Sequence, residues 1–137
     1  MIKKITFVII LSLEIVYCST QNSFKLKIGN QEYIITANNI NDTFEVTINN
    51  NTYDMMPLIY ASYSGNLSLA KFSIENGANV NAKDKYDDTA LGVASEKENL
   101  EMVKYLVENG ADVNAKFKYG YTTLRAALGK ENWEINT

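Results

Sequence analysis

This sequence of 137 residues contains two groups of acidic side chains that could bind a metal ion or act in acid–base catalysis. The first group is Asp84, Asp87, Asp88 and Asp112. Its spacing is not that of the ligands in a calcium-binding loop, so we interpret these residues as solvated turn residues. The second group interleaves carboxylates with ammonium groups: Glu96, Lys97, Glu98, Glu101 and Lys104. Opposite charges three or four positions apart share one helix face. We therefore predict an exposed, ion-paired helix face rather than paired catalytic carboxylates.

Histidine is absent from the sequence, and its one cysteine, Cys18, lies within the first twenty residues. These two facts exclude Cys–His and Ser–His nucleophilic chemistry, His-ligated zinc, CxxC redox motifs and an intrachain disulfide. The 13 basic residues are spread among 16 acidic ones, so no strongly basic face for nucleic acid can be assembled. We expect a non-enzymatic chain with no catalytic, cofactor or metal site and no nucleic-acid partner.

The amino terminus has the pattern of an export signal. Two lysines precede a largely apolar stretch of nine residues, 5–13, which is too short to span a bilayer comfortably but suits a signal peptide. We predict a signal peptide over residues 1–20 and an exported protein, which is periplasmic, on the cell surface or secreted. The alternatives are a buried amino-terminal helix or strand, and lipidation of Cys18, although Tyr17 is bulky for a lipoprotein motif.

The rest of the chain contains a repeat with a period of 33 residues. When residues 51–83 are written over residues 84–116, sixteen of the 33 positions are identical. A third copy begins at residue 117 and is truncated at residue 137. Its residues Tyr119, Thr122, Leu124 and Ala127 fall 33 positions after Tyr86, Thr89, Leu91 and Ala94.

Each period predicts two short amphipathic helices, because its apolar residues recur three and four positions apart. Thr89 is placed to cap the first helix of the second copy, and Pro57 falls in the first turn of the equivalent helix in the first copy. Gly77 and Gly110 follow the second helices, where a left-handed residue ends a helix. Gly65 occupies the tight connection between the helices of the first copy.

This layout resembles the ankyrin repeat. The residues that carry the resemblance are Pro57-Leu58 with Ala61, Thr89-Ala90-Leu91 with Ala94, Thr122-Thr123-Leu124 with Ala127, and the two Gly-Ala-x-Val-Asn-Ala blocks that begin at Gly77 and Gly110. The resemblance covers residues 51–137 and implies a mainly α helical solenoid that acts as a protein-binding scaffold. With the amino-terminal signal, it suggests an exported bacterial ankyrin-repeat protein. The turn glycine of the family is Asp54 and Asp87 in the first two copies, and aspartate tolerates that backbone better than most residues.

Residues 21–50 do not fit the 33-residue register. Apolar residues alternate with polar ones in three stretches, 24–28, 33–35 and 44–48, with turn signals between them. We expect about three short antiparallel strands. They form either a cap on the apolar side of the first repeat or a separate ligand-binding module, and the cap is favoured.

The ankyrin register also indicates a contact surface for a protein partner, formed by the projecting turns and the concave face of the inner helices. Its predicted residues are Tyr60, Tyr63, Lys85, Tyr86, Asp87, Val93, Glu96, Lys97, Lys118 and Tyr119. Tyrosine recurs at the tip of every turn, at Tyr53, Tyr86 and Tyr119, where it serves either as a contact residue or lies along the neighbouring turn. Because no equivalents of Tyr105, Leu106 and Val107 follow in the third copy, self-association through the carboxy-terminal flank is also expected.

Overall fold

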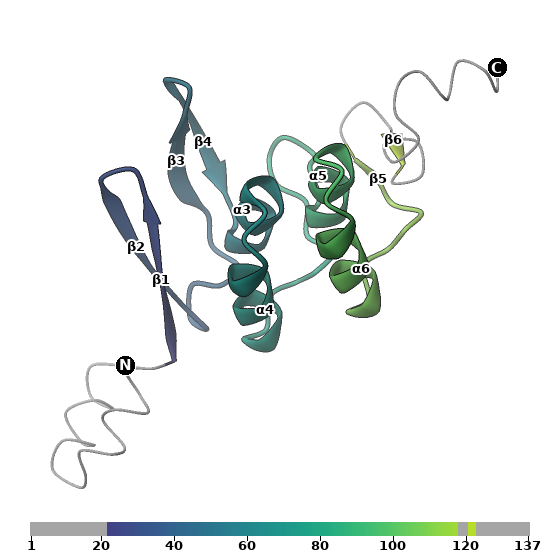
Figure 1. The fold of residues 1–137 in the computed structure, drawn as a ribbon, viewed down its shortest axis with the longest axis horizontal. Helices are drawn as coiled ribbons and strands as arrows, with labels where there is room; N and C mark the ends of the chain where they lie inside the picture. Colours follow the sequence, from purple (N-terminus) through teal and green to yellow (C-terminus); the bar gives the residue numbers. More distant parts are fainter. Residues whose placement is uncertain (1–21, 118–120, 123–137) are drawn as a thin grey trace, which may run out of the picture.

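The computed structural model describes residues 22–117 and 121–122, which form two β-hairpins followed by two helical pairs and a short strand pair (Figure 1). The strands are β1 (Ser23–Ile28), β2 (Gln31–Thr36), β3 (Phe44–Ile48), β4 (Asn51–Met55), β5 (Lys116–Phe117) and β6 (Tyr121–Thr122). The helices are α3 (Pro57–Ser64), α4 (Leu67–Glu75), α5 (Ala90–Glu96) and α6 (Leu100–Glu108). The predicted signal segment with Cys18, the contact residues Lys118 and Tyr119, and most of the third copy lie outside the described residues.

Helices account for 34% of the described residues and strands for 27%. The expectation of a mainly α chain is therefore only partly right, because strands make up a comparable share. None of the helices in the described ranges is long and apolar enough to cross a membrane.

The ends of the four helices follow the predicted capping pattern. Pro57 opens α3, and the Thr89 hydroxyl at the start of α5 accepts a hydrogen bond of 3.0 Å from the Gly92 amide. After α4 and α6 the chain turns at Gly77 and Gly110, with φ values of 91° and 93°. These left-handed residues end both outer helices at equivalent positions, as the repeat predicts.

The inner helices α3 and α5 pack against each other, and each buries an alanine at the same position of the period. Ala61 and Ala94, which stand 33 positions apart, both have no exposed surface. The asparagines Asn66 and Asn99 cap the outer helices and accept hydrogen bonds from the Leu69 and Met102 amides. The same residue types at the period of 33 thus produce the same local structure in both complete copies.

The amino-terminal strands number four rather than about three. Strands β1 and β2 pair antiparallel around a turn that includes Gly29, and β3 pairs with β4 around Asn49 and Asn50, whose φ values are 51° and 65°. Positive φ at both residues is the geometry of a tight hairpin turn. Strand β4 lies in the segment that the period assigns to the first repeat, so Asp54 is a strand residue and not a turn residue.

The first hairpin and the loop that follows it share one hydrophobic core with the helices. Leu26, Ile35 and Ile40 are at most 5% exposed and belong to the same buried cluster as the apolar residues of all four helices. The Phe24 ring packs on the Phe72 ring of α4, with 5.6 Å between centroids. Figure 1 shows β1 beside the α3–α4 pair, on the side opposite α5 and α6. The first hairpin therefore covers apolar surface that the first helical pair leaves on that side.

Two asparagines join successive loops in the same way. The Asn81 side chain donates to the Gly110 carbonyl (3.1 Å) and accepts from the Asp112 amide (2.7 Å). Asn41, from the loop between β2 and β3, donates to the Gly77 carbonyl (3.2 Å) and accepts from the Asn79 amide (2.8 Å). The amino-terminal segment is thus attached to the first repeat by the same pattern of hydrogen bonds that attaches the first repeat to the second.

Candidate protein-binding cleft

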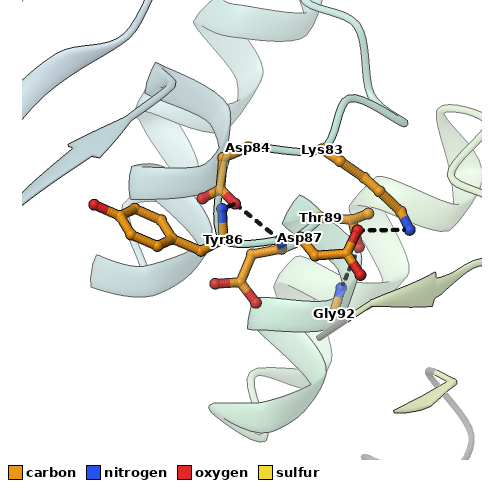
Figure 2. Close-up of polar contacts among 7 residues, drawn as sticks. Lys83, Asp84, Tyr86, Asp87, Thr89 and Gly92 are labelled. Carbon is orange, nitrogen blue, oxygen red and sulfur yellow. Dashed lines mark hydrogen bonds and ion pairs between the residues drawn. The ribbon is translucent and has the colours of Figure 1, made fainter. Parts of the chain in front are cut away.

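The turn between α4 and α5, residues 83–89, projects from the helices and is here called the finger. Its backbone is closed by a bridge between Lys83 and Thr89 and by the Asp84 carboxylate, which accepts from the Tyr86 amide (2.9 Å) and the Asp88 amide (3.0 Å). Asp87 has a φ of 63°, the left-handed geometry expected at this position. Figure 2 shows Tyr86 directed away from the ion pair that Lys83 and Asp87 form at 3.0 Å.

A cleft of about 640 Å³ opens between the β3–β4 hairpin, α3, the finger and α5. The apolar side chains of Ile59 and Val93 line it from the two inner helices and are at most 6% exposed. The remaining lining residues are Ile48, Asn49, Asn51, Tyr53, Met55, Tyr63, Tyr86, Asp87, Asp88, Glu96 and Lys97. The cleft is therefore a concave surface with an apolar base and aromatic and charged sides.

The finger is attached to the β3–β4 hairpin by two side-chain contacts. The Tyr86 and Tyr53 rings meet edge to face, with 5.9 Å between centroids, and Tyr86 remains 38% exposed. The Lys85 ammonium pairs with the Asp54 carboxylate and lies 5.3 Å from the centre of the Tyr86 ring. The hydrogen bond that the Lys85 ammonium donates to the Asp54 carboxylate raises the pKa of Lys85 above its ordinary value. The finger and the hairpin are therefore joined into one continuous wall of the cleft.

A row of aromatic rings leads along α3 to Lys97. Tyr60 packs edge to face on Phe44, with 5.8 Å between centroids, and its ring centre is 6.5 Å from that of Tyr63. The Lys97 ammonium lies 4.3 Å from the centre of the Tyr63 ring, which is a cation–π distance. Burial, together with the nearby Tyr63 and Tyr33 hydroxyls, raises the pKa of Tyr60 above its ordinary value.

Of the ten residues predicted for the contact surface, six line the cleft: Tyr63, Tyr86, Asp87, Val93, Glu96 and Lys97. Tyr60 and Lys85 lie beside it, packed on Phe44 and paired with Asp54 respectively. Lys118 and Tyr119 fall outside the described residues. The sequence indicated Tyr53 as a possible contact residue of a turn, but it did not identify the hairpin wall that Tyr53 forms with Ile48 and Met55. The alternation of residues 44–48 gives the strand but not its position beside the helices.

Two helical pairs stacked at a fixed period, with a projecting turn between them, define a solenoid repeat protein. The model of the ankyrin-repeat family, described as three copies of the repeat, matches residues 28–133, and the chain belongs to this family. No curated protein matches the chain significantly. The family match begins 23 positions before residue 51, so it includes the β2–β3 segment that does not fit the 33-residue register. Ankyrin repeats are generally protein–protein interaction modules and are typically non-enzymatic.

Proposed function

We propose that the cleft binds an extended segment of a partner protein. The observation that carries this proposal is the cleft itself, with an apolar base on α3 and α5 and three tyrosines, Tyr53, Tyr63 and Tyr86, on its sides. Tyrosine offers a large and rigid contact area with only two side-chain torsions to fix. A concave apolar surface with a few placed polar groups is the usual form of a binding site.

Rigidity of the walls supports the same proposal. The Asp84 carboxylate and the Lys83–Thr89 bridge hold the finger in one conformation, and Tyr53 fixes Tyr86 from the side. A binding surface that is already ordered loses less conformational entropy when a partner binds. The finger therefore presents Tyr86 in a fixed position.

The test is capture of the native partner by the full chain and by two variants. A Tyr63→Ala, Tyr86→Ser double variant should lose partner binding, whereas Tyr105→Ser on α6, outside the cleft, should retain it. The variant loses the Tyr53–Tyr86 and Tyr60–Tyr63 ring contacts, each worth about 0.5–1.5 kcal/mol beyond the area term, and the exposed Lys97 contact with Tyr63, so it should remain folded. Unchanged capture by a folded double variant would contradict the cleft as the binding surface.

We also propose that residues 1–20 direct export, with anchoring through a lipid on Cys18 as the alternative. The support is the lysine-led apolar run at the amino terminus. Sequencing of native protein should find a mature amino terminus between about residues 17 and 21, following the length of a typical signal. Recovery of Met1 or Ile2 would contradict export. Palmitate labelling that disappears in Cys18→Ser would support the anchor.

Self-association through the carboxy-terminal flank is a further proposal, supported by apolar exposure on α6. Leu100 is 78% exposed and Val107 40% exposed. An apolar repeat face normally packs on a neighbouring repeat. Sedimentation of the full chain should show an oligomer that Leu100→Lys dissociates, and a monomer at all concentrations would contradict the proposal.

A further inference from the structure

The direction of the backbone groups along the β3–β4 hairpin follows from its turn. Both turn residues have positive φ, so the residues on either side, Ile48 and Asn51, close the turn as a hydrogen-bonded pair. Bonded and non-bonded pairs alternate along an antiparallel ladder. Thr52 on β4 and its partner Thr47 on β3 therefore turn their amide and carbonyl groups outward, and so does Asp54, two residues further along β4.

The outer edge of β3 faces the first hairpin. Glu45, the ladder partner of Asp54, has a carbonyl that accepts a hydrogen bond of 2.7 Å from the Tyr33 hydroxyl of β2. This bond agrees with the outward direction of the backbone groups in the Glu45–Asp54 pair. The Tyr33 ring also packs on Phe44, with 4.9 Å between centroids. The first hairpin thus covers part of the β3 edge.

The outer edge of β4 borders the cleft. Tyr53 and Asp54 are adjacent, so their side chains leave opposite faces of the strand, yet both contact the finger. The finger therefore lies along the edge of β4 and not over one face, and Figure 1 shows β4 as the strand of its hairpin nearer to α5. Within the described residues, the outward backbone groups of Thr52 and Asp54 have no hydrogen-bond partner, because the finger reaches β4 only through side chains. The β4 edge is therefore open for pairing.

We propose that the partner segment binds as a third strand on the outer edge of β4, with its backbone paired to Thr52 and Asp54. This inference rests on the proposed function and specifies how the extended segment is held. A segment that joins a sheet edge gains affinity from main-chain hydrogen bonds, and pockets for its alternate side chains give specificity. One face of the added strand lies toward the apolar base at Ile59 and Val93, so the segment should carry apolar residues two positions apart.

A single strand suits this edge better than a second copy of the hairpin does. The side chains of Lys85 and Tyr86 reach β4 from the side on which the edge is open. A second copy that paired edge to edge would bring its own finger to the same place. A lone strand needs only these two side chains to move, and both are exposed. An exposed ion pair such as Lys85–Asp54 holds its side chains weakly.

The first experiment selects displayed random peptides on the full chain and discards those that also bind the Tyr63→Ala, Tyr86→Ser double variant. Each amide of the best peptide is then N-methylated in turn, which removes one backbone donor and leaves every side chain unchanged. Binding that weakens by about tenfold or more at amides two residues apart, and less at the amide between them, supports the inference. Effects without this alternation overturn the inference and leave the proposed function standing. An absence of peptides that depend on the cleft overturns both.

The second experiment follows amide hydrogen exchange in the isotope-labelled full chain by NMR. Saturation with the selected peptide should slow exchange at Thr52 and Asp54 by about tenfold or more, because a bonded amide is protected from solvent. The Thr47 amide, on the opposite edge, should be unchanged. Unchanged exchange at Thr52 would overturn the inference. Slow exchange at Thr52 that needs no peptide and increases with protein concentration would show that a second copy occupies the edge, and would also overturn it.

The third experiment removes the outward amide itself. Proline is tolerated in a strand where the amide faces outward, so Thr52→Pro removes this donor, and Thr47→Pro makes the same change on the opposite edge as the matched control. Both variants lose the contact between the Thr47 and Thr52 hydroxyls. Thr52→Pro should weaken peptide binding by about two- to tenfold, the effect of one hydrogen bond, and Thr47→Pro should change it by less than about twofold. Equal binding by the two variants, both shown to be folded by thermal melts, would contradict strand pairing at β4.

Discussion

Replacing Asn41 or Asn81 with alanine removes the same pair of hydrogen bonds from two successive loops. Each side chain donates once and accepts once, at 3.2 and 2.8 Å for Asn41 and at 3.1 and 2.7 Å for Asn81. A hydrogen bond contributes a net 0.5–1.5 kcal/mol or so to stability. Both pairs are exposed, and water can replace part of each bond. We therefore expect each variant to lower the free energy of unfolding by about 1–2 kcal/mol.

Urea denaturation followed by far-UV circular dichroism measures this loss. With an m-value of about 2 kcal/mol/M, the midpoint should fall by about 0.5–1 M in each variant. Asn38→Ala, an exposed residue of the same loop as Asn41, is the matched control and should leave the midpoint unchanged. A midpoint that falls for Asn81→Ala but not for Asn41→Ala would show that the two hairpins do not unfold together with the repeats. That result would refute the inference that Asn41 attaches the amino-terminal segment as a repeat would.

Three further predictions concern stability. Glu98 has a φ of 56° at the position where the first copy has Gly65, whose φ is 75°. A left-handed conformation costs a residue with a Cβ atom about 1–2 kcal/mol, and glycine avoids this cost. Glu98→Gly should therefore raise the melting temperature, and Gly65→Glu should lower it. The Ser73 hydroxyl is fully buried and has no hydrogen-bond partner within the described part of the chain, so Ser73→Ala should raise the free energy of unfolding by about 1–3 kcal/mol. Ser95→Ala should gain less stability, because the Ser95 hydroxyl donates to a helix carbonyl. A lower urea midpoint for Ser73→Ala would contradict this prediction. Burial raises the pKa of the Tyr60 hydroxyl in the folded state. The stability that the neutral Tyr60 side chain contributes is therefore complete below the unfolded-state pKa of about 10 and is lost as the pH rises through the raised value. Urea midpoints measured between about pH 9 and 11 should fall less steeply for Tyr60→Phe than for the unchanged protein.

The sequence predicted those parts of the fold that depend on local backbone preference. Thr89 caps α5, Gly77 and Gly110 end the outer helices, and Asp87 takes the left-handed geometry of the family's turn glycine. Each of these features depends on one residue and its immediate neighbours, so the residue type at a fixed position in the period is enough to predict it.

Strand β4 was not predicted, because its residues resemble those of the finger. Tyr53 and Asp54 match Tyr86 and Asp87 at the period of 33, and this identity favours a turn at both places. Residues 51–55 instead pair with β3 through a tight turn at Asn49 and Asn50. Pairing between strands is a non-local interaction, and it overrides the local preference of a Tyr-Asp pair.

The position of Lys97 over Tyr63 was also beyond prediction from the sequence. The helical spacing of Lys97 indicates only an exposed face with acidic neighbours. Tyr63 lies 34 positions earlier, and the two side chains meet because α3 and α5 stack side by side. Contacts between side chains of neighbouring repeats depend on how closely the helices stack and on the side-chain rotamers. The 33-residue period of the sequence specifies neither of these.

The departure of the first copy from the repeat is what closes one side of the cleft. If residues 51–55 formed a finger, that side would end at a turn. As strand β4 they carry Asn51, Tyr53 and Met55 along the cleft, and the paired strand adds Ile48. The second copy retains the family geometry at the equivalent position and supplies Tyr86, whose ring contacts that of Tyr53. The cleft therefore requires one divergent copy beside one regular copy, and binding of the proposed partner segment should depend on the hairpin as much as on the finger.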